Sequence, residues 1–385
     1  MIKNYVPDDE YIPHEEYNKL AEKFNPQAYD PDKWIAAARA AGMTYAVITT
    51  RHHDGYALWP SEFGTFGIKY LDGRDLIEPF VHACRRHGLK VGLYYSVADW
   101  NYPSFEKIMG DEAFDHKKRN PPSARPLTPE LKALREEFYS YVKGQLTELL
   151  TRYGRIDLMW FDGSVSWPGG LDLYTEETLA LVRKLQPHIV INDRYADNTG
   201  DYDTSFELEY PDRHPEGWWE ACNIWPGQKT WGYNPAETFE PIDKTLELLA
   251  RTVGWGGNLL INFGPRPDGD MPQAAYVRLY EMAQWMQHSR PAVIGVEGGP
   301  APERCELPIT RRAGVWYIHV LASHKGSVKV KNVPKPREVR LLRTGENIKY
   351  IHTNRSIRFK LPSKMRQTPD DVVAISWLDL EDPCT

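Results

Sequence analysis

Short apolar runs alternate with amphipathic segments at least five times before residue 291, and this alternation restricts the fold more than any other feature. We predict strands over 45–50, 89–95, 156–161, 189–192 and 257–264, and helices over 32–41, 74–87, 129–152, 175–185, 242–253 and 272–290. Such alternation indicates βα units and a parallel sheet. Polar residues directly follow several strands, which is typical of a (β/α) barrel of the TIM type. No GxGxxG motif opens a helix, so a dinucleotide-binding fold is not indicated.

Two further regions lack this alternation of strand-like and helix-like segments. Residues 196–240 are polar and aromatic with little periodicity, so no strand is predicted there. After about residue 298, short strand-like runs recur between tight turns, which predicts an antiparallel β-sandwich. We therefore expect a catalytic barrel over 1–297 and a C-terminal sandwich over 298–385. The sandwich either supports the barrel or binds carbohydrate.

Composition and net charge limit the classes of binding partner to expect. The 385 residues carry a net charge of -6 and no long Lys/Arg run, so we expect neither nucleic acid nor an anionic membrane as a partner. No apolar stretch is long enough for a transmembrane helix. The 13 Trp and 22 Tyr suit either sugar stacking or aromatic-rich cores. The polar, acidic N-terminal text MIKNYVPDDEYIPHEEY does not resemble a signal peptide.

The run IDLMWFDG, residues 156–163, ends a buried strand with a carboxylate and a glycine. Side chains alternate along a strand, so Trp160 and Asp162 face the same side. A carboxylate beside an indole ring suits stabilisation or attack of an oxocarbenium-like centre. A lone Asp at such a position is more often a capping residue of the next loop, so its role depends on the rest of the chain.

Three other strand ends carry polar side chains. His52 and His53 follow the first strand, a tyrosine pair at 94–95 closes the second, and Arg194 follows the fourth. Two imidazoles suit hydrogen bonds to a polyhydroxylated ligand, and the alternative for either one is a histidine satisfied by the backbone. A metal site with Asp162 is the alternative, but no HxH or HExxH motif supports it. Arg194 either orients Asp162, clamps a ligand hydroxyl, or forms a loop salt bridge.

The segment from 204 to 233 supplies candidates for a second carboxylate. It contains Glu207, Glu209, Glu216 and Glu220 among many aromatic residues. A glycosidase whose first carboxylate is a nucleophile needs a second one as acid and base. Aromatic surroundings raise the pKa of such a carboxyl group by desolvation.

Six motifs together resemble the α-L-fucosidases of glycoside hydrolase family 29. The matching text, in the order of the family, is TTRHHDGYALWPS, GLYYSVADW, LMWFDG, VINDRY, WWEACNIWPGQKTWGYNP and GGNLLINFGPRPDGDMP. The resemblance covers about residues 20–290 and extends to the C-terminal sandwich. It implies a (β/α) barrel followed by a β-sandwich.

The resemblance also implies a function. The family's enzymes are retaining exo-glycosidases that release terminal α-L-fucosyl residues from oligosaccharides or glycoconjugates by double displacement, without a metal or other cofactor. Asp162 matches the nucleophile, and the residues that match the fucose pocket are His52, His53, Tyr95, Trp160 and Arg194. The text GDYDTSFE, residues 200–207, resembles a pattern that ends in the acid/base, so we expect Glu207, with Glu209 and then Glu220 as alternatives.

Other interpretations stay open at this stage. The chain is alternatively a catalytically impaired fucose-binding barrel, a different retaining glycosidase, or a metal-dependent hydrolase that uses His52, His53 and Asp162. The family's first strand, with its HWG motif, is not visible, so either the chain is truncated at its N-terminus or its barrel closes without that strand. Localisation depends on this choice: cytoplasmic as given, periplasmic or secreted if truncated. The oligomeric state is open, a homo-oligomer included.

Overall fold

The computed structural model describes residues 12–67, 73–109, 127–163, 173–196, 199–236 and 238–377. The chain forms two compact units. The first comprises the described residues up to Arg39, Met43–Asp203 and Pro267–Asp270, and the second comprises Ala40–Gly42, Thr204–Arg266 and the residues from Met271 onward. Among the described helices, none combines the length and apolar character that a membrane crossing requires.

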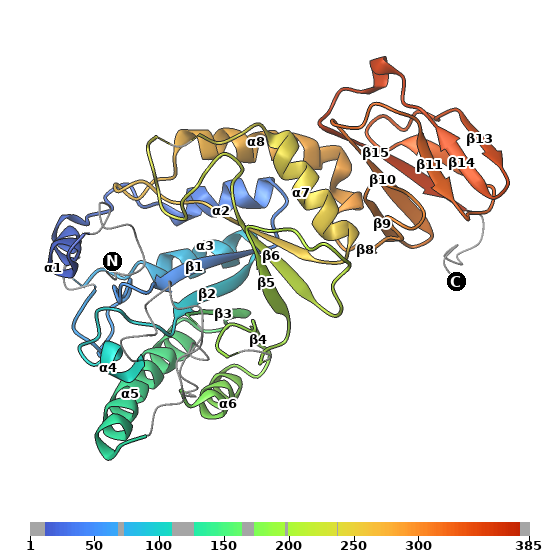
Figure 1. The fold of residues 1–385 in the computed structure, drawn as a ribbon. Helices are drawn as coiled ribbons and strands as arrows, with labels where there is room; N and C mark the ends of the chain where they lie inside the picture. Colours follow the sequence, from blue (N-terminus) through green and yellow to red (C-terminus); the bar gives the residue numbers. More distant parts are fainter. Residues whose placement is uncertain are drawn as a thin grey trace. The chain divides into compact units, whose positions relative to one another are not determined.

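A four-stranded parallel sheet forms the centre of the first unit (Figure 1). Its strands are β1 (Tyr45–Arg51), β2 (Lys90–Ser96), β3 (Leu158–Asp162) and β4 (Val190–Ile191), and they lie side by side in chain order. Gly92 of β2 faces Val47 on one side and Leu158 on the other. Consecutive parallel strands in chain order place all their carboxyl ends at one edge, where the predicted site residues lie.

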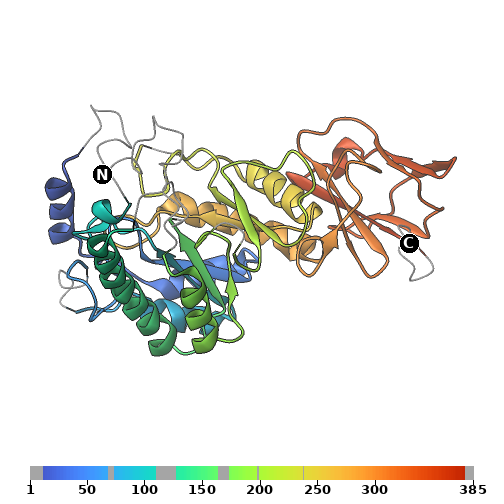
Figure 2. The same cartoon turned by 60° about the horizontal axis from the view of Figure 1, so that its bottom comes forward.

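Helices precede or separate these strands in the sequence. They are α1 (His14–Asn18), α2 (Pro31–Ala40), α3 (Ile77–His87), α4 (Phe105–Met109), α5 (Pro129–Arg152) and α6 (Thr175–Leu185), with a short 3₁₀ turn at Lys19–Lys23. Thr128 caps α5 by accepting a hydrogen bond from the Leu131 amide, and Pro129 follows at the first helical position. Gly88 ends α3 in the left-handed conformation that glycine adopts without strain. Helices α5 and α6 lie side by side (Figure 2).

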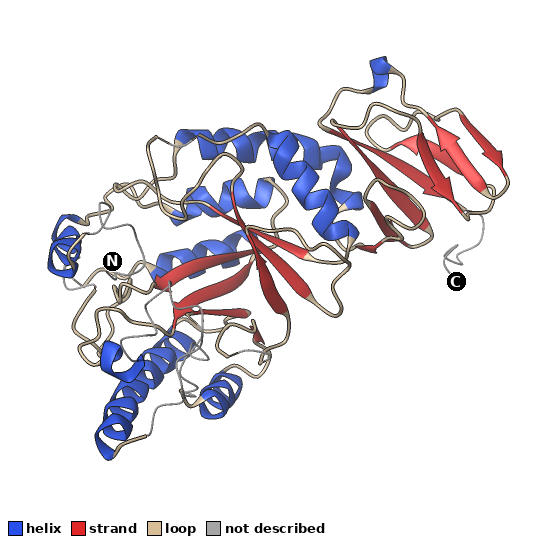
Figure 3. Ribbon diagram, viewed as in Figure 1, coloured by secondary structure: helices blue, strands red, loops and turns tan. Residues whose placement is uncertain are grey.

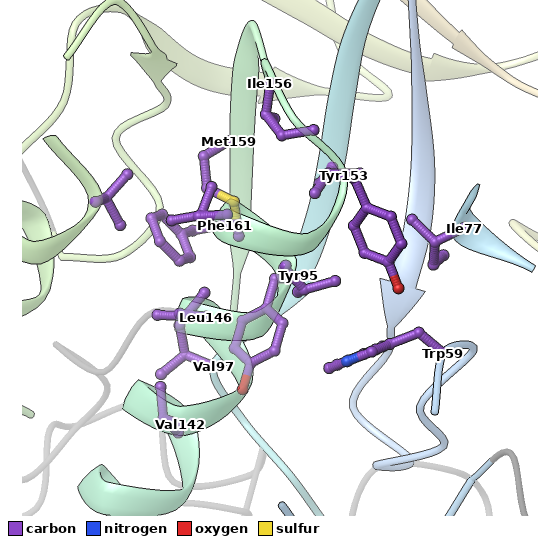
Figure 4. Packing of buried hydrophobic residues seen from close by; sticks show 14 of the residues in the cluster. Trp59, Ile77, Tyr95, Val97, Val142, Leu146, Tyr153, Ile156, Met159 and Phe161 are labelled. Carbon is purple, nitrogen blue, oxygen red and sulfur yellow. The ribbon is translucent and has the colours of Figure 1, made fainter. Parts of the chain in front are cut away.

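The core of the first unit lies between the sheet and these helices. Trp59, Tyr95, Phe161 and Leu146 have at most a trace of exposed surface there. Figure 4 shows the Tyr95 ring among Val97, Leu146 and Trp59. Burying an aromatic or aliphatic side chain of this size contributes about 1.5–3 kcal/mol, so this cluster stabilises the sheet edge behind the site.

A second sheet with parallel pairing belongs to the second unit. Its strands are β5 (Asp203–Glu207), β6 (Trp219–Ile224) and β7 (Asn258–Asn262), and β6 pairs in parallel with β7. Helices α7 (Ile242–Gly254) and α8 (Gln273–Ser289) follow β6 and β7, and a 3₁₀ turn spans Arg290–Ala292. Strands β5 and β6 fall in the region for which no strand was predicted. Buried polar residues such as Glu220 and Asn223 interrupt the apolar run of β6, so the sequence pattern did not mark it.

Antiparallel strands make up the C-terminal part (Figure 3). One sheet has the order β12 (Glu338–Leu341), β15 (Asp370–Ser376), β10 (Val315–Leu321), β9 (Ile309–Arg312) and β8 (Glu297–Gly298). The other has the order β11 (Val328–Lys331), β14 (Ser356–Phe359) and β13 (Tyr350–Thr353), and a 3₁₀ turn lies at Ser363–Met365. Residues of both sheets, including Ile318, Val330 and Phe359, form one buried cluster.

The predicted alternation of strands and helices, with parallel sheets followed by antiparallel ones, is confirmed. Closure of the parallel strands into a barrel and a domain boundary at 297/298 stay predictions. Helices α7 and α8 belong to the same compact unit as the sandwich strands.

Candidate active site

Asp162 is the last residue of β3, and three side chains from other strand ends converge on it. The Tyr94 hydroxyl donates to Oδ2 at 2.6 Å, and Arg194 Nη1 donates to Oδ1 at 3.4 Å. His53 Nε2 lies 3.6 Å from Oδ2. Gly163 follows with a φ of +71°, and a Cβ there would lie 2.8 Å from the Ala98 Cβ, so only glycine allows the chain to turn here.

These contacts keep Asp162 ionised. Burial raises the pKa of this carboxyl group, but His53, the Tyr94 hydrogen bond, Arg194 and the Gly163 amide lower it by more, so the pKa lies below its ordinary value. At neutral pH the uncharged His53 contributes little, and Tyr94 and Arg194 supply the main stabilisation of the anion. An ionised carboxylate with part of its surface open is suited to nucleophilic attack.

Four side chains form a stack beside Asp162, which we call the strand-end ladder: His52, Tyr94, Trp160 and Arg194. Tyr94 and Trp160 lie in β2 and β3, and His52 and Arg194 follow β1 and β4. The His52 and Tyr94 rings lie 5.7 Å apart at 10°, and the Tyr94 and Trp160 rings lie 5.4 Å apart at 16°. The Arg194 guanidinium carbon lies 4.5 Å from the Trp160 ring centre. The register that pairs Tyr94 with Trp160 produces this stacking. The ladder offers aromatic faces and two polar ends on the side of the sheet that bears Asp162.

His53 is held in one tautomer. Its Nδ1 lies 2.6 Å from the Ser96 hydroxyl, whose single proton is donated to the Ala98 carbonyl at 2.6 Å. The hydroxyl oxygen must therefore accept the His53 Nδ1 proton. Burial, then the neighbouring His52, lowers the pKa of His53 to about 4, against the attraction of Asp162. The neutral ring thus presents Nε2 to the site as an acceptor.

The three predicted acid/base candidates belong to the second compact unit. Glu207 is the last residue of β5 and is half-buried, and Glu209 is exposed. Leu208 between them has a φ of +58°, a conformation that strains a residue with a side chain. Glu220 lies near the start of β6, opposite Asn258 of β7, and is 2% exposed.

One group among the described residues has the composition of a metal site. Ligand atoms of His52, His53 and Asp162 lie within 4.8 Å of one another. Tyr94 and Arg194, however, already donate to the two Asp162 oxygens, and Ser96 occupies His53 Nδ1. The contacts therefore fit a site that binds hydroxyl groups, and they fit an empty metal site less well. Absence of a metal cofactor stays a prediction.

Comparison with known proteins decides the family. Residues 3–290, about three quarters of the chain, match the family described as Alpha-L-fucosidase. The chain belongs to the α-L-fucosidase family. The predicted resemblance is thereby confirmed.

Named relatives of this α-L-fucosidase family agree with the match. The tissue alpha-L-fucosidase of Bos taurus is 29% identical over 333 residues, which are 82% of this chain and 63% of the relative. The plasma alpha-L-fucosidase of Homo sapiens is 29% identical over 309 residues, which are 76% of this chain and 61% of the relative. The chain thus spans less than two thirds of the length of these relatives.

Solved structures of fucosidases share the fold. Alpha-L-fucosidase isoenzyme 1 from Paenibacillus thiaminolyticus has a TM-score of 0.80 at 29% identity, covering 96% of this chain and 91% of that one. A GH29 alpha-L-fucosidase from Bacteroides thetaiotaomicron has a TM-score of 0.80 at 25% identity, covering 95% and 86%. That structure is described as a trapped covalent intermediate with 2-fluoro-fucosyl fluoride, obtained with a glutamate-to-glutamine mutant.

The structure brings together most of the residues predicted for the family's sugar pocket: His52, His53, Trp160, Arg194 and Asp162. It corrects one of them. Tyr95 has no exposed surface, and its hydroxyl donates to Gln145 of α5 on the helix side of the sheet. Tyr94 is the tyrosine that lies beside Asp162, on the face that bears Trp160.

Sequence reasoning also missed Ser96 and Arg51. Val91, Leu93, Tyr95 and Val97 form an alternating apolar series, which marks Tyr94 and Ser96 as residues of the opposite face. This signal was available in the sequence. Arg51 is fully buried and donates to Tyr141 and Gln145 of α5 and to the Ser96 carbonyl. No sequence pattern indicated that an arginine at a strand end points into the core.

Proposed function

We propose that this protein hydrolyses terminal α-L-fucosyl groups with retention of configuration. The observation that carries the proposal is Asp162, ionised at a strand end and held by hydrogen bonds from Tyr94 and Arg194. The membership of the α-L-fucosidase family and the fucosyl intermediate described for a similar structure support it. The substrate class is a fucosylated oligosaccharide or glycoconjugate, bound in a (β/α) barrel over 1–297 that precedes the sandwich over 298–385.

The reaction is a double displacement. Asp162 attacks the anomeric carbon while a protonated glutamate gives its proton to the leaving oxygen, and water activated by the same glutamate then releases fucose. Retaining enzymes need these two carboxyl groups about 5–5.5 Å apart. Glu207 is the preferred acid/base, because it ends a strand, is half-buried, and precedes the strained Leu208. Glu209 and then Glu220 are the alternatives, and the burial of Glu220 makes it the least accessible.

The strand-end ladder accounts for substrate binding. Trp160 and Tyr94 offer aromatic faces to the apolar C–H surface of the sugar. Arg194 and His52 bear polar groups at the ends of the stack. His53 Nε2, which carries no proton in this tautomer, accepts a hydrogen bond from a sugar hydroxyl.

Substitution of the nucleophile tests the proposal. Asp162→Asn keeps the shape but removes the nucleophilic charge, so kcat for an aryl α-L-fucoside should fall by about 10³-fold or more. Asp157→Asn, at the opposite end of the same strand run, is the matched control and should keep near-normal turnover. Mass spectrometry after incubation with 2-fluoro-fucosyl fluoride should find the label on Asp162. Near-normal turnover of Asp162→Asn, or fucose binding without any hydrolysis by the wild type, would contradict the proposal.

Chelation separates this mechanism from a metal-dependent one. If His52, His53 and Asp162 bind sugar rather than a metal, prolonged dialysis against EDTA should leave kcat/KM for the aryl fucoside unchanged. Loss of activity that returns with added Zn²⁺ or another divalent ion would show that these residues hold a metal.

A further inference from the structure

The net charge of the whole chain conceals a strong asymmetry. Residues 298–377 contain 16 Lys and Arg but six Asp and Glu, a formal charge of +10, whereas the whole chain carries -6. The segments SVKVKNVPK (327–335) and NIKYIHTNRSIRFKLPSK (347–364) contain eight Lys and Arg and no acidic residue. These two segments include all three strands of the smaller sandwich sheet, β11, β14 and β13.

The alternation of side chains gathers five of these cations on one face of that sheet. Val328, Val330, Ile348, Ile357 and Phe359 point into the core cluster. Their neighbours point outward and are exposed, and they define what we call the basic sheet face: Lys329, Lys331, Lys349, Arg358 and Lys360. Among the described residues, no carboxylate forms an ion pair with any of the five.

The strand register places like charges next to one another. Lys329 lies directly opposite Arg358, and Lys349 and Lys360 flank the Tyr350–Phe359 pair at the same end. Like charges opposite each other destabilise a sheet. An uncompensated array of this kind is costly for folding alone, which indicates that the array is used for binding.

We propose that the basic sheet face binds a sulfated polysaccharide. Outward side chains recur about 7 Å apart along a strand and about 5 Å apart across strands, so the cations form a grid that a linear polymer with closely spaced anionic groups can follow. The hydroxyl groups of Thr353 and Ser356 lie on the same face and suit the remaining sugar hydroxyls. Charges within about one Debye length of each other, roughly 8 Å, act on the same segment of polymer.

Two other anionic partners fit less well. The outward positions of the three described strands hold no aromatic side chain, and single-stranded nucleic acids bind largely by stacking on aromatic rings. Ile351, 63% exposed, is the one large apolar residue there, whereas surfaces that bind anionic membranes bury an apolar stripe. This binding function goes beyond the proposed hydrolysis and does not depend on it.

Binding by the full chain to dextran sulfate and to neutral dextran tests the proposal. The wild type should bind dextran sulfate but not dextran, with an affinity that falls steeply as salt is added. The triple variant Lys329→Gln/Arg358→Gln/Lys360→Gln should bind about tenfold more weakly or worse, with a shallower salt dependence. The matched control Lys143→Gln/Lys184→Gln/Lys244→Gln removes the same charge from exposed helix positions and should bind like the wild type.

Two further measurements keep the outcome clear. The face variant should have an unchanged or higher Tm, because the substitutions remove cross-strand repulsion, so weaker binding cannot be attributed to unfolding. Both triple variants should keep wild-type hydrolysis of an aryl fucoside, which makes this test independent of the catalytic one. Equal binding by the face variant and the control would overturn the proposal. Tighter binding of a DNA duplex or of phosphatidylserine vesicles than of dextran sulfate at the same salt concentration would also overturn it.

Discussion

Tyr94 and Tyr95 are neighbours in the sequence but act on opposite sides of β2. Tyr94 hydrogen-bonds Asp162, whereas Tyr95 lies under the Arg51 guanidinium and bonds Gln145. The pair therefore offers a matched comparison, since each loses the same hydroxyl group on substitution by phenylalanine. One substitution acts on the reaction and the other on the core.

Tyr94→Phe should change the pH dependence of hydrolysis. The Tyr94 hydrogen bond lowers the pKa of Asp162, so its removal raises that pKa. Because the nucleophile must be ionised, the acidic limb of the kcat/KM profile should move to higher pH. The measurement is kcat/KM for an aryl α-L-fucoside from about pH 3 to about pH 8, a range that covers the titration of a carboxyl group.

Tyr95→Phe is the control for this prediction. It should leave the acidic limb in place and lower the Tm, because the Gln145 oxygen loses a buried donor. A shift of the acidic limb in Tyr95→Phe but not in Tyr94→Phe would show that the assignment of the two faces is wrong.

Ser96→Ala should allow the His53 ring to adopt both neutral tautomers. Without the serine oxygen, Nδ1 has no acceptor, and the ring can place its proton on Nε2, where it no longer accepts from a sugar hydroxyl. We expect kcat/KM to fall by about tenfold, and ¹⁵N chemical shifts of the imidazole to show a mixture of tautomers. Ser289→Ala removes a hydroxyl group that pairs with His288 outside the site, and it should leave kcat/KM unchanged. A single, unchanged tautomer of His53 in Ser96→Ala would contradict the role of Ser96.

At the scale of elements, a buried polar network joins the ends of β1 and β2 to α5. Arg51 donates to Tyr141 and Gln145, and Tyr141 donates to Asp99 at 2.7 Å. Asp99 lies 3.6 Å from Arg51 and is the carboxylate that balances this charge among the described residues. The network fixes the backbone on which His53 and Ser96 lie.

Asp99→Ala should destabilise the protein strongly. It leaves the fully buried Arg51 charge without its carboxylate, and breaking a buried pair in this way costs about 3–5 kcal/mol. Urea unfolding followed by circular dichroism gives the free energy of unfolding. Asp32→Ala, which breaks an exposed contact with Arg86, should leave the midpoint unchanged. Equal effects of the two substitutions would show that the network does not hold the sheet edge.

Elements with regular periodicity could be predicted from the sequence, and those without it could not. Strand β3 and helix α5 follow from an apolar run and from a proline-initiated helix of many turns. Strand β6 was missed because Glu220 and Asn223 are buried polar residues, whose partners only the tertiary fold supplies. Alternation along β2 separates the faces of Tyr94 and Tyr95, whereas the pairing of Tyr94 with Trp160 depends on the register with β3.

At the scale of the whole molecule, the core cluster of the sandwich draws on residues 301–375, and α8 makes a hydrogen bond to one of its strands. Trp285 of α8 donates to the Asp370 carbonyl at 2.8 Å, and Asp370 in turn holds the fully buried His319. A fragment that begins at residue 298 lacks Trp285 and therefore lacks this hydrogen bond. We therefore expect a fragment beginning at Met271 to unfold at a higher Tm than a fragment of residues 298–385.

Thermal unfolding of the two fragments, followed by circular dichroism, checks this expectation. Trp285→Phe in the longer fragment is the control, because it keeps most of the buried aromatic surface and removes the hydrogen bond. Identical Tm values for the two fragments would support the boundary predicted from the sequence and would show that α8 adds nothing to the sandwich.

The distribution of charge can be read from the sequence, but the net charge of the whole chain does not show it. A net charge of -6 predicted neither nucleic acid nor an anionic membrane as a partner, but residues 298–377 carry +10. Only the strand alternation shows that five of those cations share one face. The catalytic family, in contrast, could be predicted from six ordered motifs, because residues that bind one ligand are constrained in type and order together.

The strand-end ladder has a consequence for how the protein reaches its active form. Its four members lie in or shortly after four consecutive strands and span residues 52 to 194, so no single βα unit contains two of them. A partly folded chain with helices and two paired strands holds an incomplete stack. Pairing of strands far apart in the sequence is a slow step in folding. During refolding, hydrolytic activity should therefore return later than the circular dichroism signal of the helices, because activity requires that β4 has paired with β3.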